Sequence, residues 1–316
     1  MITLAPKPPL YPRPKPIRLL RGRTVTIIAG FKGFDGIVLC ADTQETVSQL
    51  SKRNVPKLRF EPFGGPHEGD GLAVAFCGAG DNGAFIDKVV ETAWEDAQVA
   101  TSLDEACDEI EKSIKRTYQE FGQIYQPGYC PTAELIYGVK MHQGCSLFSA
   151  HGPVVNRKDG YDSWGAGYYM ADFLSKRMYS AYLNIHQCAI LAAYILFQAK
   201  EHVDGCGGES HIAVLRNHGV SGRVDWRYVQ AITELLESAD QYLGELLVKS
   251  ANMELDSSEF LKEEKELIEL LDALRVGQKK ELDSPWRRNL LSRKDEKRDC
   301  FGLPMPSISE TSEPEQ

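Results

Sequence analysis

The sequence lacks any long apolar segment, and this absence excludes one class of membrane protein. No run of about 18 consecutive apolar residues, the length that a helix needs to cross a bilayer, occurs among the 316 residues. The N-terminus also lacks the apolar stretch and the small-residue cleavage site of a secretory signal. We therefore expect a cytoplasmic protein without a transmembrane helix.

Paired cysteines are missing as well. Eight cysteines are scattered along the chain without a Cys-x-x-Cys pair, and Cys40, Cys77, Cys145 and Cys188 fall inside apolar stretches. A disulfide framework needs an oxidising compartment and is typical of short secreted chains. We therefore expect reduced cysteines in the core of a cytoplasmic protein.

Positive charge is scarce. The formal net charge is −9, whereas nucleic-acid binding depends on clustered lysines and arginines that contact phosphates. The main cationic block is residues 1–23, which contain six lysines and arginines, six prolines and no acid. Prolines at this density prevent a helix or a central strand and favour extended polyproline conformation. We predict an arm or pro-segment outside the core, and neither nucleic acid nor membrane as a partner.

From Thr24 onward the pattern changes to short apolar runs with strand and helix periodicity. A glycine-containing turn splits two β-rich runs and predicts a hairpin over 24–42. Further strands are expected at 56–60, 71–77, 134–140, 145–150 and 211–217, and helices within 78–97, 103–121, 171–183 and 186–203. This order lacks the strict alternation of a parallel doubly wound sheet. It predicts an α+β domain over 24–224, with antiparallel sheets and paired outer helices: a four-layer α-β-β-α sandwich.

The C-terminal region has a different character. Apolar residues from Val229 to Leu246 recur at three- and four-residue spacing, which predicts a long helix with one apolar stripe. A second, acidic helix is expected from about 257 to 276. These helices could pack on their own domain or against a neighbouring subunit, and the sequence favours neither. We expect a helical extension over 225–280 and a largely disordered tail over 281–316.

The opening hairpin resembles a known family. TIIAGFKGFDGIVLCADTQ, from Thr26 to Gln44, is similar to the first hairpin of proteasome α and β subunits, which belong to the N-terminal-nucleophile (Ntn) hydrolases. The likeness continues at PKL around Lys57, at AVAFCGAGDNGAFID and at GCGGESHIAVL. It spans roughly 24–220 and implies a bacterial proteasome-like protein with the same sandwich and with threonine-peptidase ancestry.

The resemblance also implies a catalytic site. It assigns the nucleophile to Thr26, the aspartate to Asp42 and the lysine to Lys57. A threonine hydroxyl needs an adjacent base, and in this superfamily that base is the free α-amine of the same residue. An α-amine has a pKa of about 7.7–8 and can take a proton near neutral pH, whereas a peptide nitrogen cannot. The lysine lowers the pKa of the hydroxyl, and the aspartate keeps the lysine charged.

The sequence departs from the family's pattern at the nucleophile. Thr26 is internal, so the chain must break after Val25 to free the amine. Active subunits carry glycine at that preceding position, whereas Val25 is β-branched and stiff. Thr24 is a backup nucleophile, because a shift of two residues keeps it on the same face of the strand.

The supporting residues of the family depart further. Its serine in a Gly-Ser-Gly turn falls on Ala166, and its serine before the late Gly-Gly pair falls on Cys206. Its second aspartate could only be Asp204, displaced by one residue. Asp204 and Cys206 are therefore weak supporting candidates.

Together these features predict a proteasome-like Ntn hydrolase that is weakly active or inactive, and oligomeric. A chain processed before Thr26 is expected to act as a threonine-type endopeptidase on proteins or peptides. Self-assembly, with a ring as one form, and an ATP-dependent unfoldase are the partners that the resemblance implies. The alternative is a non-catalytic assembly subunit of the α type, which keeps the sandwich as a scaffold.

A remote alternative rests on three glycines. Gly78-x-Gly80-x-x-Gly83 lies after a strand and before a helix, where a dinucleotide-binding oxidoreductase holds its pyrophosphate. That unit needs a parallel strand after the helix, but here a second helix follows. We expect the glycines to allow close helix–sheet packing, and no cofactor.

Three possible metal ligands cluster late in the chain. His202, Cys206 and His211 have side chains that bind zinc, but no second ligand pair completes a tetrahedral site. We therefore expect no metal.

Overall fold

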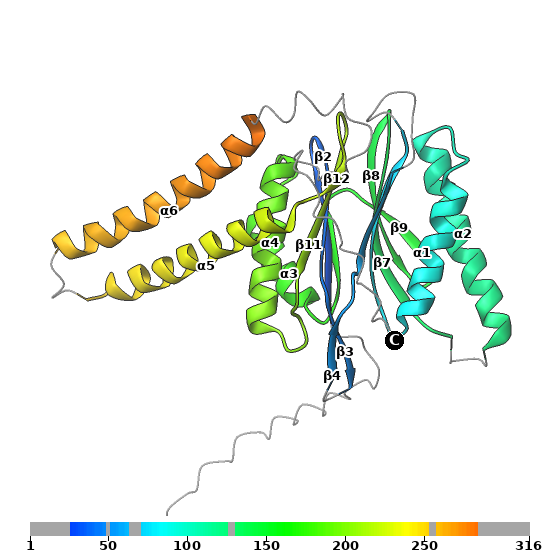
Figure 1. Cartoon of the computed structure of the whole chain (residues 1–316), viewed down its shortest axis with the longest axis horizontal. Coiled ribbons are helices and arrows are strands. Elements are labelled where there is room, and N and C mark those ends of the chain that lie inside the picture. Colours follow the sequence, from blue (N-terminus) through cyan, green and yellow to red (C-terminus); the bar gives the residue numbers. More distant parts are fainter. Residues whose placement is uncertain (1–25, 49–50, 63–70, 126–129, 253–256, 284–316) are drawn as a thin grey trace, which may run out of the picture.

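The computed structural model describes residues 26–48, 51–62, 71–125, 130–252 and 257–283. The predicted proline-rich arm, Thr24 and most of the predicted tail lie outside these residues. Within them the chain forms a mixed α+β fold with six helices and three antiparallel sheets (Figure 1). This confirms the predicted α+β class. No helix in the described part is long and apolar enough to span a membrane.

The first five-stranded sheet contains the predicted opening hairpin. Its strand order is β10-β1-β2-β11-β12. The strands are β1 (Ile27–Gly33), β2 (Gly36–Asp42), β10 (Tyr161–Gly165), β11 (Ser210–Arg216) and β12 (Gly222–Arg223). Helices α3 (Tyr168–Met178) and α4 (Ile185–His202) pack their apolar side chains on one face of this sheet. Every residue of β2 is buried, because helices cover one face and the second sheet covers the other.

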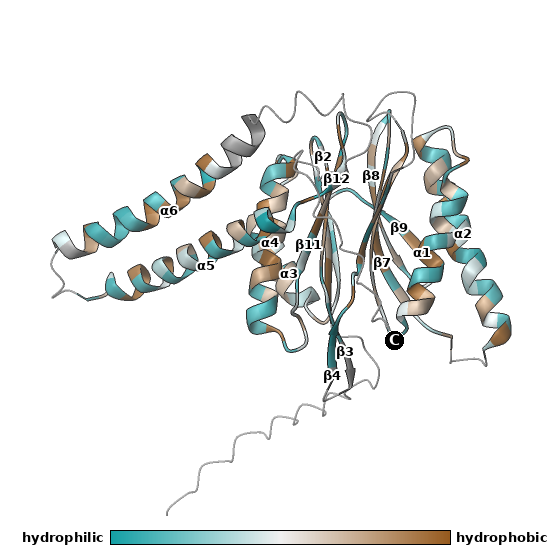
Figure 2. Cartoon of the chain, viewed as in Figure 1, coloured by the Kyte–Doolittle hydropathy of each residue, from teal (hydrophilic) through white to brown (hydrophobic). Residues whose placement is uncertain are grey.

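The second five-stranded sheet has the order β5-β6-β7-β8-β9. Its strands are β5 (Leu58–Pro62), β6 (Ala73–Gly80), β7 (Ala133–Met141), β8 (Gly144–His151) and β9 (Val154–Lys158). Helices α1 (Gly83–Ala97) and α2 (Leu103–Ile124) cover its outer face. A third apolar cluster, including Ile28, Leu39, Ile136 and Leu147, lies between the two sheets. Figure 2 shows apolar colour concentrated on the strands and on one side of α1 and α4.

Five short strands were absent from the sequence prediction, and one of them is β12. β3 (Gln44–Ser48) and β4 (Ser51–Asn54) form a two-stranded sheet, and β9 and β10 form outer strands of the two larger sheets. β9, with the sequence VVNRK, is exposed or half-buried at every position. Such polar strands carry no apolar alternation, which is the signal that predicts a strand.

Two long C-terminal helices form a hairpin that projects from the sheets (Figure 1). They are α5 (Trp226–Lys249) and α6 (Ser257–Asp283), so α6 continues beyond its predicted end near 276. Val229 and Ile232 are buried against the α3–α4 side of the first sheet. Farther along the hairpin, large apolar side chains are exposed, among them Leu243, Leu247, Val248, Leu261 and Ile268. The hairpin therefore packs on its own domain at the base only.

The remote dinucleotide-binding alternative is wrong. β6 pairs antiparallel with both β5 and β7, so the parallel strands of a Rossmann unit are missing at this point. A Cβ on Gly78 would lie 2.4 Å from Cγ2 of Ile86 in α1, and one on Gly80 would lie 2.2 Å from the carbonyl oxygen of Thr132. Both glycines therefore serve close packing, Gly78 between helix and sheet.

Candidate active site

Thr26 lies immediately before β1 and is fully buried. Its carbonyl oxygen accepts a hydrogen bond from the backbone N–H of Gly167 at 3.1 Å. Gly165 approaches the same carbonyl so closely that a Cβ there would lie 2.3 Å from the oxygen, and its φ is +91°. The turn Gly165–Gly167 therefore fixes the backbone of Thr26 and requires glycine at position 165.

Asp42 is the last residue of β2 and is also fully buried. Its Oδ1 accepts a hydrogen bond from the Thr26 hydroxyl at 2.5 Å and from the backbone N–H of Ile27 at 3.2 Å. Its Oδ2 accepts from the backbone N–H of Gly207 at 2.9 Å. Three donors from two segments of the chain therefore hold the carboxylate in one orientation, beside the hydroxyl.

Lys57 reaches the same point from the segment before β5, in the second sheet. Its Nζ donates to the Thr26 hydroxyl at 2.5 Å, to Oδ1 of Asp42 at 2.7 Å and to the carbonyl oxygen of Gln44. The Lys57 side chain is 8% exposed. Burial lowers the pKa of Lys57 below its ordinary value, and the Asp42 carboxylate opposes this shift. The structure thus brings together the three residues that the sequence assigned to the site.

The arrangement polarises the threonine hydroxyl from both sides. The hydroxyl donates to Asp42 and accepts from Lys57, so a positive charge faces its oxygen. A cation within hydrogen-bond distance favours the ionised form of an acid. The cluster can therefore stabilise negative charge that develops on the oxygen of Thr26 during attack on a carbonyl.

Of the weaker candidates Cys206 and Asp204, only Cys206 lies next to the site. Cys206 is buried, and its Sγ lies 3.1 Å from a Cβ built on Gly167, next to the site. Burial, with a contribution from Asp42, raises the pKa of its thiol to about 12, which makes it a packing residue and a poor nucleophile. Asp204 is exposed and takes no part in the hydrogen bonds of the cluster. Ala166 packs with the apolar side chains of α3 and α4.

The backbone groups that support Asp42 were not predicted from the sequence. Gly207 donates to Asp42 and accepts from the backbone N–H of Gln44 at 3.0 Å. Next to it, Gly208 has φ of +71°, and a Cβ there would lie 2.4 Å from Oγ1 of Thr43. The Gly-Gly pair was the available signal, because a strained glycine beside a strand marks a close backbone approach.

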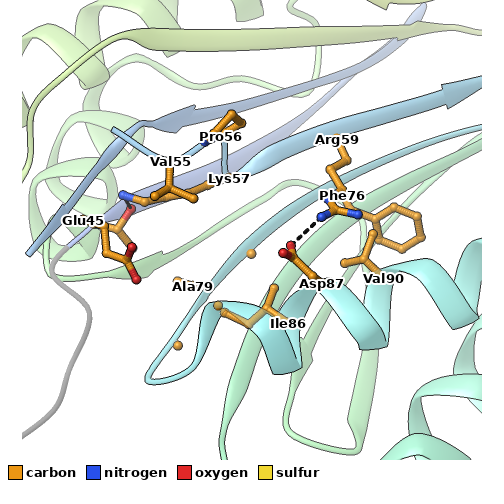
Figure 3. Close-up of a pocket in the computed structure, with 14 residues that line it drawn as sticks. Glu45, Val55, Pro56, Lys57, Arg59, Phe76, Ala79, Ile86, Asp87 and Val90 are labelled. Carbon is orange, nitrogen blue, oxygen red and sulfur yellow. Dashed lines mark hydrogen bonds and ion pairs between the residues drawn. The ribbon is translucent and has the colours of Figure 1, made fainter. Parts of the chain in front are cut away.

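An open cleft begins at Thr26. It is partly open to the solvent, has a cavity volume of about 60 Å³, and runs between β5, β6 and the start of α1. Val55, Pro56 and Ile86 provide apolar walls, and Arg59 pairs with Asp87 at 2.6 Å. Figure 3 shows this ion pair at one end of the cleft and Glu45 at the other.

No metal centre is formed by the described residues. They contain no group of three or more His, Cys, Asp and Glu side chains placed to hold a metal ion. Of the three possible zinc ligands, His211 contacts Glu209 at 3.2 Å through Nε2, and His202 is exposed.

Replacing Gly165 with alanine is expected to lower the free energy of unfolding by about 2 kcal/mol or more. The alanine must adopt a left-handed backbone, at a cost of about 1–3 kcal/mol, and displace the carbonyl of Thr26. Gly244→Ala is the matched control, because nothing lies within 4 Å of its Cβ position in α5 and alanine favours helix by about 1 kcal/mol. Urea denaturation measures both. A Gly165→Ala protein as stable as the parent would show that the turn is not constrained.

Comparisons with known proteins identify similar solved structures. No family model and no curated protein sequence matches the chain. The structure of Anbu (ancestral β-subunit) from Yersinia bercovieri aligns with a TM-score of 0.56 at 16% identity, covering 73% of this chain and 98% of that chain. The helical assembly of the Anbu complex from Pseudomonas aeruginosa gives 0.56 at 15% identity, with 70% and 96% covered. An Anbu (Gly-1) mutant from Hyphomicrobium sp. strain MC1 gives 0.55 at 13% identity, with 70% and 99% covered.

At these identities the likeness shows the fold alone. It also corrects the family that the sequence motifs indicated. The similar structures are Anbu proteins, which form a proteasome-like family distinct from the proteasome α and β subunits. The assignment to the α/β subunit family is therefore wrong, and the chain has the fold of Anbu proteins.

Proposed function

We propose that this chain carries a threonine-type Ntn-hydrolase site that is latent while Thr26 remains inside the chain. The observation that carries the proposal is the buried three-way contact of Thr26, Asp42 and Lys57. A charged pair at 2.7 Å around a hydroxyl is costly to bury, and a plain structural core does not need it. Two sheets with helices on both outer faces support the four-layer Ntn-hydrolase sandwich.

In the processed chain, the free α-amine of Thr26 is the general base. It takes the hydroxyl proton as Oγ1 attacks the carbonyl carbon of a peptide bond, and it then returns the proton to the leaving amine. The acyl-threonine formed in this way is hydrolysed by water that the same amine activates. Lys57 lowers the energy of the developing charge on Oγ1, and Asp42 holds Lys57 in place.

In the intact chain the same cluster has no base. The nitrogen of Thr26 belongs to the Val25–Thr26 peptide bond, and an amide nitrogen does not take a proton near neutral pH. Asp42 accepts from the hydroxyl but also pairs with Lys57, which suits it for orientation rather than for proton transfer. The intact chain is therefore nearly inactive, and the ordering of the cluster precedes any activation.

The second candidate is a non-catalytic scaffold that assembles with copies of itself. Exposed apolar side chains along α5 and α6, such as Leu247 and Leu261, favour self-association, and one similar Anbu structure is described as a helical assembly. We assign 24–224 to the domain and 225–280 to an extension for such contacts, with an unfoldase as a further partner. The seven described cysteines are all free, which supports the cytoplasm as the compartment.

An electrophilic peptide that captures N-terminal threonine distinguishes the two candidates. We expect an adduct on Thr26 after a specific protease has cut a sequence inserted before it, and no adduct on the intact chain. Mass spectrometry of the labelled peptide locates the adduct, and Thr26→Ala is the control. A cut chain with free Thr26 that forms no adduct would favour the scaffold.

A further inference from the structure

The cleft beside Thr26 has an acidic residue whose partner lies outside it. Glu45, in β3, lines the cleft, and its side chain is only 13% exposed. Its Oε2 accepts a hydrogen bond from Nε of Arg53 at 2.5 Å. Arg53 is 62% exposed and does not line the cleft. The Glu45 carboxylate therefore forms part of the cleft wall, whereas the guanidinium of Arg53 faces the solvent.

The second oxygen of Glu45 points toward the start of α1. A Cβ built on Gly83, which also lines the cleft, would have Oε1 of Glu45 as its one neighbour within 4 Å, at 4.0 Å. Since Oε2 is bonded to Arg53, Oε1 is the oxygen with acceptor capacity toward the cleft. A side chain at Gly83 would narrow the entrance to this oxygen.

The other charges of the lining are balanced. Lys57 is paired with Asp42, and Arg59 is paired with Asp87 at the far end of the cleft. Glu45 also contributes, after Asp42 and Cys206, to raising the pKa of Lys57, so its charge acts on the site. Between Glu45 and the far ion pair, the walls are the apolar side chains of Val55, Pro56 and Ile86 (Figure 3).

We propose that the cleft selects a basic side chain of the peptide substrate, with Glu45 as the specificity-determining residue; the inference rests on the proposed hydrolase function. Lysine and arginine combine an apolar stem with a cationic end, which matches apolar walls that lead to one carboxylate oxygen. The stem lies on Val55, Pro56 and Ile86, and the cationic end donates to Oε1. An acidic side chain in the same place meets the Glu45 charge and is rejected.

Binding to the intact chain tests the inference without catalysis. The probes are three acetylated tripeptide amides that differ only in the last residue: arginine, norleucine or glutamate. We expect the arginine peptide to bind about tenfold more tightly than the norleucine peptide, because hydrogen bonds to charged groups are strong where solvent is partly excluded, and the glutamate peptide to bind least. Titration calorimetry or a competition assay gives the three Kd values.

Two variants isolate the contribution of Glu45. Glu45→Gln keeps the shape and removes the charge, so the arginine preference is expected to disappear. Glu91→Gln is the control, since Glu91 is an exposed acid of α1 that pairs with Lys88 and does not line the cleft. Equal binding of the three peptides, no measurable binding of any of them, or a preference that survives in Glu45→Gln overturns the inference.

Cleavage by the processed chain separates this inference from the proposed function. If peptides are cleaved with equal kcat/KM after arginine and norleucine, the hydrolase stands and the role of Glu45 is refuted. If nothing is cleaved or labelled, but arginine-selective binding is observed and is lost in Glu45→Gln, the hydrolase fails and the selection of basic side chains by Glu45 stands. Both the hydrolase function and the role of Glu45 are supported if kcat/KM is about tenfold higher for cleavage after arginine than after norleucine, as in binding. In Glu45→Gln the two kcat/KM values should then be equal.

Discussion

Freeing the α-amine of Thr26 is expected to raise peptidase activity by about 10²–10⁴-fold over the intact chain, the range that a positioned general base contributes. The hydroxyl, Asp42 and Lys57 are already within 2.7 Å of one another, so the missing component is the base. The measurement uses a protein with a specific protease sequence inserted before Thr26, cut after folding. Rates on fluorogenic peptides are compared before and after the cut.

Three controls identify the source of the activity. Thr26→Ala in the cut chain should abolish the gain, and Lys57→Ala should remove most of it. Thr26→Ser should retain a measurable part, because it keeps the hydroxyl and the amine. Activity that is equal before and after the cut, or that persists in Thr26→Ala, contradicts a threonine mechanism. If a cut before Thr24 activates the chain and Thr24→Ala abolishes that activity, the nucleophile is Thr24, two residues before the assigned position.

Replacing Lys57 with methionine is expected to lower the free energy of unfolding by about 3–5 kcal/mol, the cost of leaving a buried charge without its partner. Asp42 is fully buried, and Lys57 is its only ion-pair partner among the described residues. Asp42→Asn should have a similar effect, because it leaves the Lys57 ammonium without its carboxylate. The double variant, with both charges removed, should recover part of the loss. Urea denaturation of the intact chain provides the values.

An exposed ion pair of the same type is the reference. Lys88 and Glu91 are 3.4 Å apart on α1, with side chains 52% and 56% exposed. Lys88→Met is expected to change the free energy of unfolding by less than about 1 kcal/mol, as is usual for surface pairs. If Lys57→Met lowered the free energy of unfolding as little as Lys88→Met, water would have to reach Asp42. This outcome would contradict the burial of Asp42 in the structure.

Much of the domain could be predicted because its strands follow simple rules. β1 and β2 are apolar runs joined by a two-residue turn, and Gly33 pairs with Gly36 across it. Thr26 and Asp42 flank this hairpin, so their meeting follows from the register, in which Ile28 faces Ala41. Lys57 immediately precedes β5 of the other sheet, and only the family's spacing suggested that it reaches the same point.

The other parts of the fold and of the candidate site depend on contacts between distant segments, which no local sequence pattern predicts. β3 and β4 are polar strands, recognisable only by their pairing, yet β3 places Glu45 in the cleft. The support of Asp42 by Gly207 joins positions 165 residues apart, and Asp204 differs from a usable position by one residue. Sequence spacing could not decide which of these side chains faces the site.

The family assignment failed for a related reason. The motifs on which it depended encode features of the fold: a tight hairpin, glycines that admit a helix, and a Gly-Gly approach to a strand. A Cβ on Gly78 would collide with Ile86, and one on Gly208 would collide with Thr43, so these glycines serve the packing of the fold. Such residues therefore identify a fold and do not separate the families that share it.

The projecting hairpin has a consequence for how the molecule opens. In α5, Asp240 accepts hydrogen bonds from Tyr194 of α4 at 2.8 Å and from Gln198 of α4 at 3.0 Å, whereas Leu243, Leu247 and Val248 farther along α5 are exposed. Regions with few buried contacts open at a lower free energy than the core. Backbone amides of residues 241–252 should exchange with solvent by partial opening, whereas β1 and β2 exchange only when the whole domain unfolds. The distal hairpin can thus melt and re-form while the hydroxyl of Thr26 stays ordered.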